Sequence, residues 1–209
     1  YCAFWSSSCY LIVMPVIING SGSVTGLSVG GLPDGTVDAD TLASNAVTSA
    51  KLASGVGGKI LQVKQTVKLD TFSTTSTNLV DVTGLSVSIT PSSTSSKVLV
   101  RCSVAMSTQS ANFTYAQLLR GSTFLGEAAA AGNRNRPTLM MYQAFDTTVI
   151  MQNFEFLDTP NTTSATTYKV QLRCATSGTA YIGRSHNDGD GVNVEPRLSS
   201  TITVEEVAA

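Results

Sequence analysis

The chain has 209 residues, a formal net charge of −1 and only 13 % charged residues. Its length suits one domain with an appendage, or two small domains. Because it has neither a basic face nor a cluster of Lys and Arg, we expect no nucleic acid partner and no membrane insertion. The low charged fraction, with many Ser, Thr, Asn and Gly residues, is typical of sheet surfaces and tight turns.

The first thirteen residues, YCAFWSSSCYLIV, do not fit the pattern of a targeting segment. They carry no basic start, and they are shorter than the roughly 20 apolar residues that a membrane-spanning helix needs. Met14-Pro15-Val16 resembles a natural start. We therefore interpret residues 1–13 as upstream read-through and leave them out of the fold.

Residues 14–33 form a stretch rich in Gly and Ser, with small aliphatic residues spaced through it. Two interpretations are open, a flexible linker and an extended arm that becomes ordered against another protein. The placement of the aliphatic residues slightly favours the arm, which we expect to attach to other virion proteins; these residues are Val24, Leu27, Val29 and Leu32.

Residues 34–58 place their larger apolar side chains five residues apart, at Val37, Leu42, Val47 and Leu52. That interval fits neither one face of a lone helix nor a strand. The segment is either an extended wrap or a short helix with a face of alanines, and in both cases its narrow apolar stripe needs a partner. We predict a stalk that packs against copies of itself in a trimer.

Residues 59–209 show repeated strand signals with turn residues between them. We predict an all-β, antiparallel jelly-roll sandwich. The expected strands are 60–69, 78–82, 85–90, 97–106, 115–120, 123–130, 138–143, 147–157, 167–175, 180–184 and 200–207.

Of the four cysteines, Cys102 and Cys174 alternate with Val and Leu on expected strands, which places them inward. We expect both to be free thiols in the core rather than members of a disulfide, because a free thiol behaves as a small apolar group. The aromatic residues are expected to divide between the core and a subunit interface. They are Tyr115, Tyr142, Phe145, Phe154, Phe156, Tyr168 and Tyr181.

Several stretches of sequence together resemble a known pattern. They are NAVTSAKLASGVGGKILQV, GLSVSITPSSTSSKVLVRCSVAM, YAQLLRGSTFLG, FEFLDTPNTTSATTYKVQL and STITVEEV. The last four as a set resemble the head domains of bacteriophage tail-fibre-like proteins, which are similar to the trimeric jelly rolls of tumour necrosis factor and the complement globular domain. The first resembles the phage fibre stalks that lead into such heads. The resemblance covers roughly residues 35–207. It implies a trimeric fibre or decoration protein of the virion, made in the host cytoplasm, with no catalytic residues to transfer.

Two polar loops are the candidate binding sites, because exposed loops on a rigid sandwich tend to carry specificity. The first contributes Asn133, Arg134, Asn135 and Arg136, and the second His186, Asn187, Asp188 and Asp190. Two interpretations stay open: these side chains contact a host receptor, either a surface glycan or a protein, or they pair across subunits and stabilise the trimer.

We find no pattern for catalysis, a metal or a cofactor. The one histidine, His186, has no evident nucleophile partner. Asp188-Gly189-Asp190-Gly191 lacks the spacing and the distal Glu of a calcium loop, and a hairpin turn explains it more simply. We therefore expect a non-enzymatic virion fibre protein that binds the host cell surface through several weak sites. The alternatives are a purely structural fibre or head-decoration protein and, less favoured, a glycan-degrading enzyme.

Overall fold

A computed structural model describes residues 44, 46–48, 51, 59–192 and 194–209 of the chain. The chain divides into two units, Tyr1–Gly57 and Gly58–Ala209, and every strand in the described ranges belongs to the second unit. Of the predicted stalk residues, Val47 is described and about half exposed, whereas Val37, Leu42 and Leu52 lie outside the described residues. The predicted arm at 14–33 and the segment 1–13 lie outside them too. No helix in the described part is long and apolar enough to span a bilayer.

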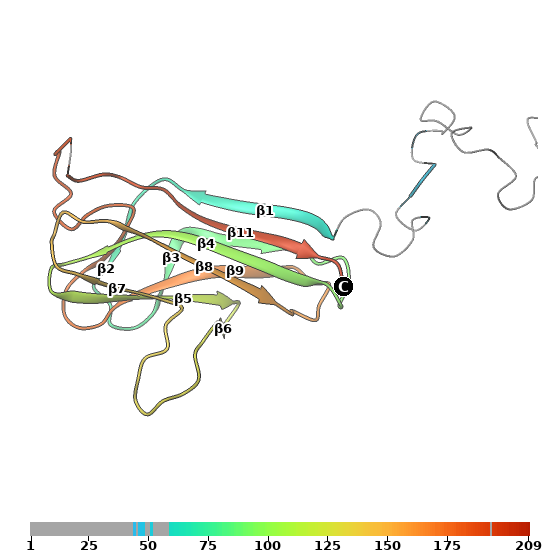
Figure 1. The fold of residues 1–209 in the computed structure, drawn as a ribbon, viewed down its shortest axis with the longest axis horizontal. Coiled ribbons are helices and arrows are strands. Elements are labelled where there is room, and N and C mark those ends of the chain that lie inside the picture. The colour runs from blue at the N-terminus through green and yellow to red at the C-terminus, as the bar shows by residue number, and fades with distance from the viewer. Residues whose placement is uncertain (1–43, 45, 49–50, 52–58, 193) are drawn as a thin grey trace, which may run out of the picture. The chain divides into compact units, whose positions relative to one another are not determined.

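Residues 59–209 fold as an antiparallel two-sheet sandwich of the jelly-roll type, which confirms the predicted fold class (Figure 1). One sheet has the order β1-β11-β4-β10-β2, and β8 pairs with the free side of β4. Its strands are β1 (Ile60–Lys68), β2 (Phe72–Thr74), β4 (Lys97–Thr108), β8 (Ile150–Asp158), β10 (Ala180–Ile182) and β11 (Ser200–Val207).

The second sheet has the order β3-β9-β5-β6, with β7 also paired to β5. Its strands are β3 (Val80–Ile89), β5 (Asn112–Arg120), β6 (Thr123–Leu125), β7 (Leu139–Gln143) and β9 (Thr166–Cys174). The two strands expected at 78–82 and 85–90 are one strand, β3, whose register shifts around Gly84. Gly84 has a φ of 81°, a conformation that glycine adopts without a steric penalty.

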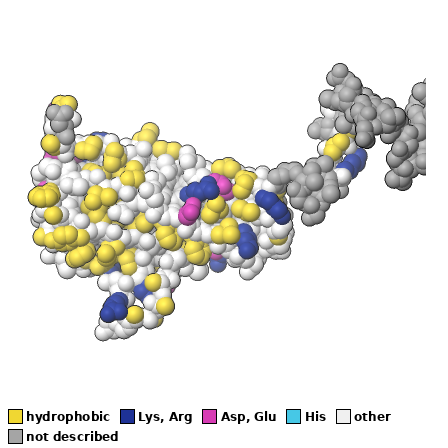
Figure 2. All heavy atoms as spheres, viewed as in Figure 1, with side chains coloured by type: hydrophobic (Ala, Val, Ile, Leu, Met, Phe, Trp, Pro, Cys, Tyr) yellow, Lys and Arg dark blue, Asp and Glu magenta, His cyan; other side chains and the backbone are white. Residues whose placement is uncertain are grey.

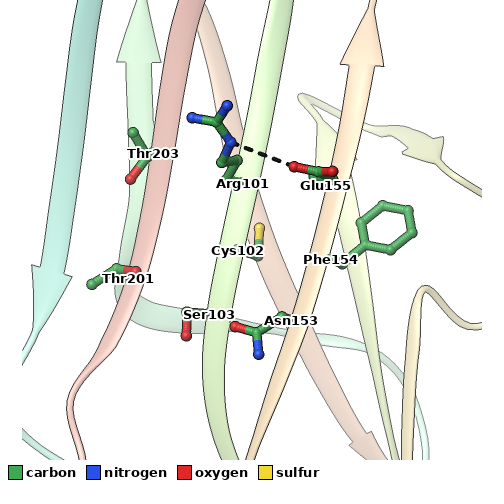
Figure 3. A pocket seen from close by; sticks show the side chains of 8 residues that line it. All are labelled: Arg101, Cys102, Ser103, Asn153, Phe154, Glu155, Thr201 and Thr203. Carbon is green, nitrogen blue, oxygen red and sulfur yellow. Dashed lines mark ion pairs between the residues drawn. The ribbon is translucent and has the colours of Figure 1, made fainter.

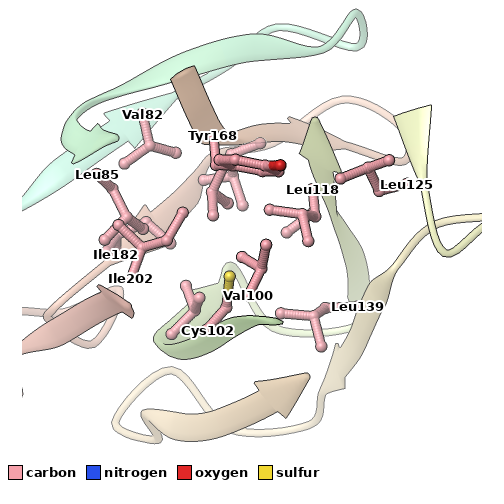
Figure 4. Close-up of a cluster of buried hydrophobic side chains, with 14 of the residues drawn as sticks. Val82, Leu85, Val100, Cys102, Leu118, Leu125, Leu139, Tyr168, Ile182 and Ile202 are labelled. Atoms are coloured by element: carbon pink, nitrogen blue, oxygen red, sulfur yellow. The ribbon is translucent and has the colours of Figure 1, made fainter. Parts of the chain in front are cut away.

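The core lies between the sheets and is built from the inward-facing members of each alternating strand (Figure 4). Val98, Val100, Cys102 and Val104 of β4 are all buried, and Cys174 of β9 is buried as well. Both described cysteines are free, as predicted. Burial raises the pKa of the Cys102 thiol to about 12, so this thiol stays protonated and inert at neutral pH.

A buried polar cluster joins the sheets at one end of β8. The Arg120 guanidinium of β5 donates to both oxygens of Asp158, at 2.9 and 2.8 Å. The hydroxyl of Tyr168 on β9 donates to Asp158 at 2.7 Å. Burial, and then the neighbouring carboxylate, raise the pKa of Tyr168 above its usual range. The Asp158 carboxylate on β8 therefore links the first sheet to β5 and β9 of the second sheet through hydrogen bonds.

The edge strand β1 has the reverse of the alternation that a sandwich strand usually shows. The residues directly opposite the inward-facing positions of β11 are polar, and they are Gln62, Lys64, Thr66 and Lys68. The apolar residues Val63 and Val67 lie opposite Glu205 and Thr201, on the outer face, and about half of each is exposed. Leu61 is also half exposed. This strand therefore places apolar side chains in solvent, while Gln62, Thr66 and Lys68 are partly or fully buried and Lys64 stays exposed.

Candidate binding surfaces

The β6–β7 loop, residues 126–138, projects from the second sheet (Figure 1) and carries four of the predicted site residues. Gln117 of β5 pins both ends of the loop: its amide donates to the Leu125 carbonyl at 3.1 Å and accepts from the Thr138 amide at 3.2 Å. Gly126 begins the loop with a φ of 68°, and a Cβ there would lie 2.4 Å from the ring of Phe154. The loop therefore leaves the sheet at a fixed position. Its first residue is a glycine because a side chain there would collide with Phe154 and strain the backbone.

Within this loop, Arg136 differs from its neighbours. Its guanidinium lies 3.4 Å from Glu127 and donates to the Ala128 carbonyl at 3.2 Å, so it closes the loop on itself. Asn133, Arg134 and Asn135 are exposed. These three side chains are available to a partner, whereas Arg136 also has a local structural role.

The β10–β11 loop, residues 183–199, carries the other four predicted residues. Three of its charged side chains pair locally: Asp188 lies 3.3 Å from Arg184 and 2.7 Å from Arg197. The Arg184 guanidinium stacks over the Tyr181 ring, 4.2 Å from the centroid. Asn187 and Asp190 are exposed.

The structure does not bring the two predicted loops together in one chain. Figure 1 shows them at separate places on the sandwich. Among the described residues, the ion pairs of each loop stay within that loop. A contact between the two loops therefore requires two copies of the chain, and pairing across subunits stays a prediction.

The outer face of the first sheet holds a shallow depression of about 500 Å³ over β11, β4 and β8 (Figure 3). Arg101 crosses it, 3.4 Å from Glu155 on β8 and also paired to Glu205 on β11. Small polar side chains line the remainder of the depression, and they are Ser103, Asn153, Thr201 and Thr203. Sequence reasoning missed this depression, because it depends on which strands become neighbours.

The structure sorts the aromatic residues between core and surface. Tyr168 is fully buried, Tyr181 is nearly so, and Phe154 and Phe156 pack half-buried against the core. Tyr142 and Phe145 are exposed. Exposed and half-buried aromatic side chains gather on the outer face of the second sheet, where Phe113 and Tyr142 have ring centroids 4.8 Å apart.

His186 is held by the hydroxyl of a neighbouring tyrosine. Its Nδ1 lies 2.7 Å from the Tyr181 hydroxyl, and the adjacent Ser185 Oγ accepts a hydrogen bond from the Asp188 amide at 3.1 Å. These two hydrogen bonds hold the loop in place. Among the described residues, no group of three or more His, Cys, Asp and Glu side chains is arranged to hold a metal ion.

Comparison with known proteins gives a distant structural likeness. No family model matches the sequence, and no curated protein matches it. The fold is similar to that of T=1 particles derived from infectious bursal virus, with 13 % identity over 70 % of this chain and 40 % of that chain, and a TM-score of 0.37.

Two further structures give comparable figures. The infectious bursal disease virus Gt strain matches with 14 % identity over 71 % of this chain and 38 % of that chain, and a TM-score of 0.38. The VP2 subviral particle of infectious bursal disease virus matches with 12 % identity over 70 % and 41 %, and a TM-score of 0.33. The chain therefore spans well under half the length of these viral chains, and none of the three is a tail fibre.

Proposed function

We propose that this chain is a homotrimeric fibre protein of a bacteriophage virion, and that its sandwich domain binds the host cell surface. The observation that carries the proposal is the reversed alternation of β1. Val63 and Val67 lie on the outer face of the first sheet, and each is about half exposed. An exposed apolar surface on a soluble protein usually marks an interaction site.

The opposite edge of the same sheet adds to this apolar surface. Met151 and Leu157 on β8 are exposed as well. Figure 2 views the sandwich from the side of β1, β11, β4 and β8, where hydrophobic side chains are spread widely and charged ones are few. The central Arg101 pairs with Glu155 and with Glu205, and these three side chains together carry a net charge of −1.

Further copies of the chain suit this face. It is apolar at both edges and carries a net charge of only −1 at its centre, so three copies that turn this face toward a common axis repel each other weakly. The net charge of −1 adds little long-range repulsion between copies. The resemblance of the sequence to phage fibre heads also favours self-assembly. So does the stalk predicted at residues 34–58, because its narrow apolar stripe needs a partner. In such an oligomer the exposed loop residues Asn133, Arg134 and Asn135 would be repeated, and several weak contacts would act together.

Adsorption to cells tests host binding. The labelled full chain is incubated with candidate host bacteria, and the bound fraction is measured by flow cytometry. We expect saturable adsorption that falls several-fold in an Arg134→Ala/Arg136→Ala variant, because multivalent binding amplifies a small loss at each site. A Lys64→Ala/Lys97→Ala variant removes the same charge from exposed strand positions and should adsorb normally.

Two results would contradict host binding. One is equal adsorption by the loop variant and the strand variant. The other is binding to purified phage particles without any binding to cells, which would instead support a head-decoration or cement protein.

A further inference from the structure

The outer face of the second sheet carries an aromatic patch, defined here as Phe113, Tyr115, Met140 and Tyr142. Tyr142 and Met140 are about half exposed, and Phe113 is 39 % exposed. The Phe113 ring stacks at 6.5 Å from Tyr115 and lies at 4.8 Å from Tyr142. The pairing of β5 with β7 explains this grouping, since Phe113 is opposite Tyr142 and Tyr115 is opposite Met140. A sheet whose outer face served only as a solvated surface would carry polar residues at these positions.

A depression of about 140 Å³ lies beside the patch, between the face of β5 and the β6–β7 loop. Tyr115 belongs to both the patch and the depression, and Phe124 forms an apolar side with 45 % of its surface exposed. Asn135 and Arg136, two of the residues predicted from sequence, also line the depression. Because Gln117 pins both ends of the loop, these groups are held in place before a ligand arrives.

Three charged residues line the depression, Glu127, Arg136 and Arg173, and their charges sum to +1. Arg136 pairs with Glu127 at 3.4 Å. Arg173 stacks over the Tyr115 ring, 4.5 Å from its centroid, and donates to the carbonyls of Thr77 and Cys174, each at 3.3 Å. An anionic ligand would therefore find both guanidinium groups already engaged. A neutral ligand with many hydroxyl groups can use the remaining hydrogen-bonding capacity of Asn135, Arg136 and Glu127.

These features match the chemistry of a sugar ring. A pyranose has an apolar face of C–H groups, which packs on an aromatic ring, and a rim of hydroxyls, which need donors and acceptors at fixed positions. The depression supplies an exposed aromatic ring at Phe124, a half-buried ring at Tyr115 that Arg173 covers on one face, and polar groups on its loop side. We infer that this depression and the adjoining aromatic patch bind a neutral saccharide. The inference rests on the proposed function, and it names the class of host-surface molecule recognised.

A glycan array tests this site. The full-length chain is applied to immobilised neutral and acidic microbial oligosaccharides, and the same preparation is tested for adsorption to host cells. We expect binding to neutral glycans, weakened about tenfold by Phe124→Ala and by Tyr142→Ala, because each removes one aromatic contact. Tyr142→Phe, which keeps the ring, should bind nearly as well. Phe145→Ala is the matched control, since Phe145 is exposed and aromatic but lies outside both the patch and the depression.

The outcomes separate this inference from the proposed function. Unchanged glycan binding by Phe124→Ala, or binding to acidic glycans alone, would overturn the saccharide site. So would adsorption to cells without binding to any glycan, and that result would leave host binding intact. If Tyr142→Ala dissociates the oligomer and leaves glycan binding unchanged, the aromatic patch is a subunit contact and the inference fails. Absence of both cell adsorption and glycan binding would overturn both proposals.

Discussion

At the scale of single residues, Glu206 shows how this fold satisfies a buried charge. Its carboxylate is fully buried near the end of β11. It accepts hydrogen bonds from the Ser92 amide at 2.7 Å, the Ser92 hydroxyl at 2.6 Å and the Gln62 amide at 2.6 Å. Burial alone would raise the pKa of this carboxyl, but the hydrogen bonds from Ser92, Gln62 and Ser96 outweigh it and lower the pKa to about 2.

The lowered pKa of Glu206 predicts a particular dependence of stability on pH. Because the pKa falls from 4.5 to about 2 on folding, the charged carboxylate stabilises the fold fully above pH 4.5, and this stabilisation is lost as the pH falls toward 2. The shift corresponds to about 3 kcal/mol. We expect Glu206→Gln to lower the free energy of unfolding at pH 7 by roughly that amount and to flatten its decline between pH 4.5 and 2. Urea unfolding at one fixed protein concentration measures both effects.

Glu155→Gln is the matched control for this experiment. Glu155 is a well-exposed member of an ion pair, so its loss should cost less than about 1 kcal/mol. If Glu206→Gln and the unaltered chain lose stability in parallel between pH 4.5 and 2, the buried carboxylate is not the cause of acid sensitivity.

At the scale of elements, alternation along the sequence predicted most strands of the sandwich, and the failures have identifiable causes. β2 was missed because three residues, Phe72–Thr74, give too short a pattern to recognise. The strand expected at 123–130 ends at Leu125, since Gly126 takes a positive φ and starts the loop. The outward apolar side of β1 could not be predicted, because periodicity shows which residues share a face and does not show which face is buried.

The depression beside the β6–β7 loop was also predictable only in part. Composition pointed to the loop residues Asn135 and Arg136, and the structure places both beside Tyr115 and Phe124. The sequence could not predict that neighbourhood, because β5 and β9 meet only when the second sheet forms and bring Arg173 over Tyr115. Polar loops can thus be recognised locally, whereas the surface beside them depends on long-range strand pairing.

Asp158 links three strands, and sequence reasoning missed this role because strand periodicity does not show that Arg120 and Tyr168 come to lie beside it. Asp158→Ala leaves the Arg120 guanidinium and the Tyr168 hydroxyl without their shared acceptor. Arg120 retains some solvent access, so we expect a loss of about 2–3 kcal/mol in the free energy of unfolding, measured by urea denaturation. Tyr168→Phe removes one hydrogen bond of the cluster and should cost about 1 kcal/mol. A smaller loss for Asp158→Ala than for Tyr168→Phe would contradict a cluster centred on the carboxylate.

At the scale of the whole molecule, the two outer faces of the sandwich differ in what they offer. The face over β1, β11, β4 and β8 is apolar at its edges and has a small net charge at its centre, which suits contact with further copies of the chain. The face over β5 and β7 offers aromatic rings beside a fixed polar loop, which suits a sugar. A protein that uses one face to assemble and the other to bind gains avidity from assembly without needing a deep pocket at any single site.

The most direct test of self-assembly is the mass of the full chain in solution, measured by sedimentation equilibrium at micromolar concentrations. We expect a species of three times the 21.8 kDa chain mass, and we expect Val63→Asp to shift it toward single chains, because a charge at that exposed position would have to be desolvated at the subunit contact. A single-chain mass for the unaltered protein at these concentrations would contradict the proposed trimer.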